Sequence, residues 1–202
     1  MRIASLFLGL CALLACGCEK HIMLDYRPLG LAGMGSGSVE QLKSLNISAV
    51  ELLQIVKLKT AGVSDDTCVA LVAAAHQHQH IFNSPDAVAN LQGARYSELE
   101  ILEIARNDKL DSISTEAVTL RLIGLSDSTV QMILQRLLQG QPTLSSAQIS
   151  RLKNTGLTEK QIIERVNQGM TDEQAETEIT RRETLRNHAN TGITRVHGRT
   201  AH

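Results

Sequence analysis

The sequence predicts an all-α protein built from tandem helical hairpins, with an irregular helical bundle as the alternative. Three observations lead to this prediction. A four-residue phrase, made of Gly, an apolar residue, Ser or Thr, and Asp or Glu, occurs at 62–65, 124–127, 156–159 and 169–172. Apolar residues around it recur at the three- and four-residue spacing of a helix. No segment shows the sustained alternation of apolar and polar residues that is typical of a strand.

The repeated phrase is typical of a junction between two helices. In its third copy, Gly156 suits the left-handed position that ends a helix, where a side chain would be strained. Leu157 would fold back onto that helix, and Thr158 with Gln161 would form a capping box at the start of the next one. Glu159 places negative charge at the positive end of its own helix. The phrase therefore needs no ligand to explain it.

The residues before position 48 are predicted to be an export signal and a tether. Arg2 precedes an uncharged run from Ile3 to Ala15, and its 13 residues are fewer than the roughly 20 that span a membrane. We therefore expect a cleavable signal over residues 1–15. Residues 16–47 include the Gly- and Ser-rich stretch PLGLAGMGSGS, which predicts a flexible tether.

The signal ends in LLAC, residues 13–16, which resembles the lipobox of bacterial lipoproteins. This resemblance implies cleavage before Cys16 and attachment of acyl chains to its thiol, palmitate among them; Cys18 is the weaker alternative. Each buried CH₂ contributes about 0.8 kcal/mol, so two or three acyl chains anchor a protein stably. We therefore expect a lipoprotein of the bacterial cell envelope. Gly17 follows the candidate cysteine where an Asp would favour the inner membrane, which slightly favours the outer membrane.

Nine helices are expected after the tether, beginning near residues 49, 65, 85, 98, 115, 127, 146, 159 and 172. A hydroxyl residue suited to capping precedes each start: Ser48, Ser64, Ser84, Ser97, Ser114, Ser126, Ser145, Thr158 and Thr171. Glycines at 62, 93, 124 and 156 recur at steps of 31 or 32 residues, a period typical of stacked hairpins. The helical repeat domain is predicted to span 48–187, and residues 188–202 to form a disordered basic tail.

The histidines of AHQHQH, residues 75–80, give the alternative functional hypothesis. His76 and His80 are four residues apart, so on a helix they would share one face and could bind a divalent metal. This pattern suggests a periplasmic metal-binding protein. The structural alternative is a solvated helix end. Cys68 lies in an apolar helical stretch and is expected in the core.

Two further patterns suggest charged partners. Residues 144–166 resemble the helix-turn-helix of LuxR-type regulators, but the second helix carries balanced charge and the export signal removes the chain from DNA, so no nucleic-acid partner is expected. Five arginines, Arg181, Arg182, Arg186, Arg195 and Arg199, lie near the C-terminus and could meet an anionic partner. A solvated helix end followed by a soluble tail explains them equally.

The sequence contains no motif of a known catalytic or nucleotide-binding site, so we expect a protein that is not an enzyme. No cofactor and no small-molecule substrate are expected. Aromatic residues are 2% of the chain, which leaves few rings for a stacking platform. The sequence therefore predicts a lipid-anchored scaffold that binds another protein or supports the envelope.

Overall fold

The structure, a computed structural model, describes residues 24–197, with side chains as far as His188. These residues form eleven helices and no strand, which confirms the all-α prediction. The helices are α1 Arg27–Leu31, α2 Ser36–Ser44, α3 Ala49–Thr60, α4 Asp65–Gln77, α5 Pro85–Gly93, α6 Glu98–Arg106, α7 Leu110–Leu122, α8 Asp127–Leu138, α9 Ser146–Asn154, α10 Glu159–Asn167 and α11 Asp172–His197. Within this part of the chain, no helix has the length and apolar character needed to cross a bilayer.

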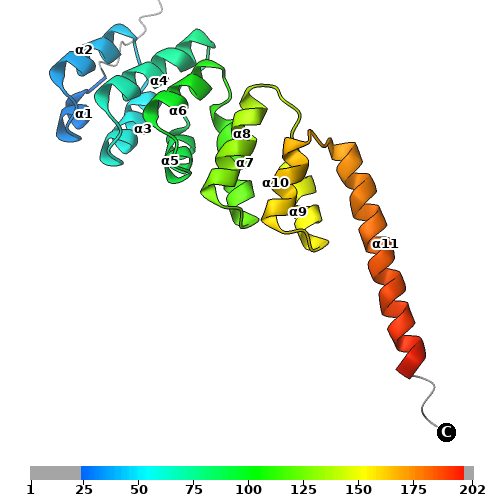
Figure 1. The fold of residues 1–202 in the computed structure, drawn as a ribbon. Coiled ribbons are helices and arrows are strands. Elements are labelled where there is room, and N and C mark those ends of the chain that lie inside the picture. The colour runs from blue at the N-terminus through cyan, green and yellow to red at the C-terminus, as the bar shows by residue number, and fades with distance from the viewer. Residues whose placement is uncertain (1–23, 198–202) are drawn as a thin grey trace, which may run out of the picture.

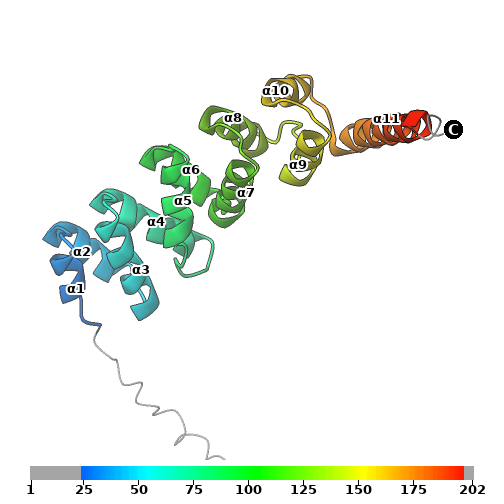
Figure 2. The same ribbon diagram turned by 90° about the horizontal axis from the view of Figure 1, so that it is seen from below.

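Successive helices pair as hairpins that stack in a row (Figure 1). Odd-numbered helices pack on one another from α1 to α11, and the even-numbered helices α2, α4 and α6 form a second layer. Figure 2 shows the hairpins following one another along the row. Because most helices contact the helix two places along, the chain is a stacked array, in which most contacts join neighbouring hairpins.

Eight of the nine predicted helix starts agree with the structure, because the capping chemistry that marks them is local. Ser48, Ser97 and Thr158 each form a complete capping box. The ninth prediction was wrong: α7 begins at Leu110, not near 115. The residue expected to cap it, Ser114, is buried within the helix.

The array repeats with a period of two hairpins. Backbone positions with positive φ recur 61 or 62 residues apart, in the sets Gly33, Arg95 and Gly156; Asn46, Asp108 and Gly169; Gly62 and Gly124; Gln79 and Gly140. The predicted turn glycine at 93 was therefore misplaced. Gly93 ends α5, and the left-handed position belongs to Arg95. Residues one period apart occupy equivalent places, so one half of the array can be compared with the other.

Acidic residues at the first position of four helices join neighbouring hairpins. Glu98 of α6 accepts hydrogen bonds from the Ser64 amide at 3.1 Å, from the Ser64 hydroxyl and from the Thr67 hydroxyl, all at the start of α4. One period later, Glu159 of α10 accepts from the amide and hydroxyl of Ser126, at 3.1 and 2.6 Å, and from the Thr129 hydroxyl. Glu98 and Glu159 thus each cap a helix of the preceding hairpin as well as starting their own helix.

The same arrangement occurs at both ends of the array. Asp65 of α4 accepts from the amide of Gly35, the N-cap of α2, at 2.7 Å, and Asp172 of α11 accepts from the amide of Ser145, the N-cap of α9, at 2.9 Å. Hydrogen bonds of this kind favour the ionised carboxylate. The pKa of Glu159 is lowered by the hydroxyls of Ser126 and Thr129, against the opposing effect of burial. These capping acids link the hairpins electrostatically.

The core lies between the two layers and is apolar. Equivalent positions keep apolar side chains from one period to the next, as for Leu58 and Leu120 or Leu71 and Ile133. Cys68 is fully buried here, as expected, and burial raises the pKa of its thiol to about 12. A thiol that stays protonated is a packing residue and a poor nucleophile.

Two boundary predictions were wrong. The segment expected to be a flexible tether contains α1 and α2, because Leu29 and Leu42 are fully buried and this burial outweighs the local Gly and Ser content. At the other end, α11 continues to His197, ten residues beyond the expected end at Asn187. Extending an existing helix costs less free energy than nucleating one. Of the expected disordered tail, 198–202 lies outside the described residues.

Candidate docking cleft

The structure separates the two histidines of the metal hypothesis. α4 ends at Gln77, so His76 is in the helix and His80 is in the following loop. His76 Nε2 lies 2.7 Å from Glu51 Oε1, and His80 Nε2 lies 2.9 Å from Asp108 Oδ1. Among the described residues, no group of three or more His, Cys, Asp or Glu could hold a metal ion. Glu51 also accepts a hydrogen bond from the Phe82 amide at 3.0 Å. This carboxylate therefore ties α3 to α4 through His76 and to the α4–α5 loop through Phe82.

The remaining predicted sites give no cluster. Cys16 and Cys18 lie outside the described residues. Arg182 pairs with Glu178 within α11. Arg165 of α10 pairs with the same carboxylate at 2.8 Å, and this second pair helps to fix α11 on the array. Arg181 and Arg186 are exposed; the side chain of Arg195 is not described, and Arg199 lies outside the structure. α9 and α10 form the two capped helices expected within 144–166.

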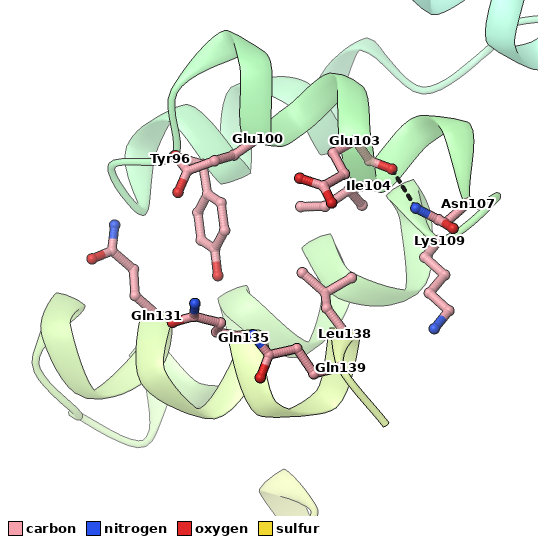
Figure 3. A pocket seen from close by; sticks show the side chains of 10 residues that line it. All are labelled: Tyr96, Glu100, Glu103, Ile104, Asn107, Lys109, Gln131, Gln135, Leu138 and Gln139. Carbon is pink, nitrogen blue, oxygen red and sulfur yellow. Dashed lines mark hydrogen bonds between the residues drawn. The ribbon is translucent and has the colours of Figure 1, made fainter. Parts of the chain in front are cut away.

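A cleft lies between α6 and α8, with a cavity volume of about 430 Å³. We call it the α6–α8 cleft. Figure 3 shows its two walls, α6 with the preceding turn and α8. It is lined by Tyr96, Glu100, Glu103, Ile104, Asn107, Lys109, Gln131, Gln135, Leu138 and Gln139. Eight of these ten residues carry a polar or charged group, so the cleft can hydrogen-bond a ligand.

The cleft is open because the side chains on its walls differ from those one period away. Gln131 and Gln135 of α8 stand where α4 has Val69 and Ala73, and α4 packs on α2. Tyr96 stands where the first half has Met34. Longer polar side chains at these places favour separation of the helices, and few residues of α6 approach α8.

Elsewhere in the array, the acid that starts one helix accepts a hydrogen bond from the start of a helix in the preceding hairpin. This hydrogen bond is missing between α8 and α6. Asp127, the first residue of α8, does not cap α6: it pairs with Arg95 at 3.2 Å and with Arg121 at 3.3 Å. The amide of Ser97, which starts α6, donates instead to Glu100 of its own helix at 2.8 Å. The carboxylate that would draw α8 to the start of α6 is thus used elsewhere.

Several groups in the cleft have unused hydrogen-bonding capacity. Gln131 Nε2 donates to the carbonyls of Ala94 and Arg95 at 3.3 and 3.2 Å, which fixes its position. Within the described part of the chain, the side chains of Gln135 and Gln139 form no hydrogen bond, and both are exposed. These two amides can therefore meet a ligand without breaking a bond inside the protein.

The hydroxyl of Tyr96 is the most unusual group in the cleft. The residue is 8% exposed, and its hydroxyl has no hydrogen-bond partner within the described residues. Figure 3 shows the ring extending from the α6 side towards Gln135 on α8. Burial, with a smaller contribution from the charge of Glu100, raises the pKa of Tyr96 to about 12, so the group remains a hydrogen-bond donor. A buried hydroxyl without a partner costs stability, and a ligand could supply the missing partner.

A second hollow, of about 710 Å³, lies beside the α4–α5 loop. Several of its polar groups already have hydrogen-bond partners. Ser84 donates to Asp111 at 2.9 Å, His80 pairs with Asp108, and Asn83 accepts from Gln54 at 3.1 Å. The α6–α8 cleft is therefore the better candidate for a binding site.

Sequence reasoning did not find this cleft. The only available signal was the spacing of Gln131, Gln135 and Gln139, four residues apart on one helix, which is equally typical of a solvated helix face. Comparisons of the chain with protein-family models, curated proteins and solved structures find no match.

Proposed function

We propose that the protein is a non-catalytic docking scaffold of the bacterial cell envelope, anchored by acyl chains on Cys16, and that a protein partner binds in the α6–α8 cleft. The observation that carries this proposal is the buried hydroxyl of Tyr96, which lacks a partner beside an open, polar cleft. Stacked hairpins suit such a role, because they present an extended surface on a rigid frame.

The chemistry of the cleft favours binding over catalysis. Its lining holds two carboxylates, three glutamines, an asparagine, a lysine and a tyrosine, without the Ser, Cys or His that forms the usual nucleophile–base pair. The pKa of Glu100 is lowered by hydrogen bonds from the hydroxyl and amide of Ser97, so it stays ionised at neutral pH and is a poor general acid. Amides and fixed charges of this kind recognise a ligand.

The membrane part of the proposal rests on the lipobox-like residues 13–16. From Cys16 to Arg27, where α1 begins, the chain has eleven residues and reaches about 40 Å at most when fully extended. An anchored protein would therefore hold its array close to the membrane surface. A partner would then lie in the same membrane or in the adjoining space.

Metabolic labelling with palmitate, followed by fractionation of the envelope, tests the anchor. We expect the label on the wild-type chain and on Cys18→Ala, but not on Cys16→Ala. The Cys16→Ala chain should also be absent from the fraction that contains mature lipoproteins. Equal labelling of wild type and Cys16→Ala would contradict anchoring at this residue.

Site-specific photo-cross-linking in intact envelopes tests the docking role. A photoreactive amino acid is placed at Gln139, at the rim of the cleft, or at Gln77, the exposed equivalent in α4. We expect one discrete cross-linked protein from position 139 and none from position 77. Identical products from both positions, or none from either, would oppose docking in this cleft.

A further inference from the structure

We infer that the α6–α8 cleft binds an extended peptide segment that carries a basic side chain. This inference rests on the proposed function and specifies the part of the partner that is recognised. Three features of the cleft carry it: the spacing of the glutamines on α8, the unpaired hydroxyl of Tyr96, and the carboxylates on α6.

Gln131, Gln135 and Gln139 form a row along α8 and its C-cap, which we call the glutamine row. Four residues of a helix advance about 6 Å at 1.5 Å per residue. Two residues of an extended chain advance about 6.6 Å at roughly 3.3 Å per residue. The row therefore matches every second residue of an extended peptide over this short length.

A glutamine amide can both donate and accept hydrogen bonds, as a peptide group does. Gln135 and Gln139 have both capacities unused, and Gln131 keeps its amide oxygen while its nitrogen bonds the α5–α6 turn. An extended segment exposes N–H and C=O groups that need such partners. A helical ligand would satisfy most of its backbone groups internally and would offer the row mainly side chains.

The hydroxyl of Tyr96 provides a further contact at one end of the cleft. It is enclosed, lacks a partner and lies on the side of the cleft that faces Gln131 and Gln135 (Figure 3). A peptide carbonyl next to the glutamine row could accept a hydrogen bond from this hydroxyl. This contact would fix the register of the segment, because the hydroxyl is held by a buried ring.

The charges of the cleft favour a basic side chain. Glu100 and Glu103 stand on the α6 wall, opposite the glutamine row, and Lys109 lies at the end away from Tyr96 (Figure 3). The carboxylate of Glu103 forms no hydrogen bond or ion pair within the described residues. A Lys or Arg of the peptide would complement the two carboxylates, and it would lie towards the Tyr96 end, away from Lys109.

Selection from a random nonapeptide library displayed on phage tests the inference, with the full-length chain solubilised in detergent as the target. We expect selected peptides to share a Lys or Arg at one position. Fluorescence anisotropy then measures the Kd of one selected peptide. Gln135→Ala should weaken binding about tenfold, as expected for the loss of one or two hydrogen bonds. Glu103→Gln should weaken it about threefold at low salt and less at high salt.

The controls are Gln77→Ala and Glu173→Gln, exposed residues outside the cleft whose replacement should leave Kd unchanged. Binding that is insensitive to Gln135→Ala, or selected peptides without a shared basic residue, would overturn the inference. Preferential binding of a peptide covering residues 188–202 would overturn assignment to a separate partner and favour a second copy of the chain. If no peptide binds but Gln139 still cross-links a protein, the extended-peptide inference fails while the docking scaffold stands.

Discussion

Replacing Tyr96 by Phe should stabilise the free protein and weaken its binding to the partner segment. The change removes one buried oxygen without a hydrogen-bond partner and leaves the packed ring in place. Leaving such a group unpaired costs about 1–3 kcal/mol. We therefore expect the local free energy of opening around α5 and α6 to increase by about 1 kcal/mol, which corresponds to roughly fivefold slower amide exchange.

Hydrogen–deuterium exchange with mass spectrometry is the appropriate assay, because a stacked array need not unfold as one unit. Peptides covering residues 94–109 should exchange more slowly in Tyr96→Phe, whereas peptides covering α9 should not change. Tyr26→Phe serves as the control, since that ring is only partly buried. The same Tyr96→Phe variant should bind the selected peptide more weakly, although it is the more stable protein.

The two effects have opposite signs, so loss of structure cannot imitate the expected result. A destabilised Tyr96→Phe variant would show that the hydroxyl has a partner in the free protein, and would remove the main support for the cleft. A stabilised variant with unchanged peptide affinity would show that the ligand does not use the hydroxyl.

Three further predictions concern the array. Glu98→Ala removes a carboxylate that accepts three hydrogen bonds from the preceding hairpin and should cost about 2 kcal/mol in denaturant unfolding, whereas the exposed Glu164→Ala should cost little. Gln79→Gly should stabilise the chain by about 1 kcal/mol, because Gln79 has a φ of 61° and this region strains residues with a side chain. Arg165 lowers the pKa of Glu178 to about 2 from 4.5. The ion pair should therefore stabilise α11 fully above pH 4.5, and this stabilisation should be lost as the pH falls towards 2. Amide exchange in α11 measures the loss.

The sequence predicted the parts of the fold that depend on neighbouring residues. The starts of α3, α6 and α10 could be located because Ser48, Ser97 and Thr158 cap helices through residues three places along the chain. The start of α7 could not, because its turn uses a left-handed Asp108 in place of glycine. The helices α1 and α2 were missed because their stability comes from burial of Leu29 against later helices, which local composition does not reveal.

The cleft was missed for a related reason. Its opening depends on what α8 presents to α6, and these helices are separated along the chain by α7. The sequence showed three glutamines at helical spacing but not that they face a gap. It also gave no sign that the Tyr96 hydroxyl would be enclosed without a partner. The pairing of His76 with Glu51, 25 residues away, was equally hidden, because it joins two helices and local sequence patterns do not reveal it.

The internal repeat shows how a binding site can arise in such an array without loss of the fold. Equivalent positions that hold the hairpins together keep their chemistry, as Glu98 and Glu159 do, whereas Val69 and its equivalent Gln131 differ. At the cleft, α5 and α7 still pack closely, so the hairpins stay joined through the odd layer while α6 and α8 stand apart. A segment bound between α6 and α8 would bridge the two hairpins on the side where their helices stand apart. Binding would then restrict bending of the array between these two hairpins, because the bound segment supplies the contacts that α6 and α8 do not make with each other.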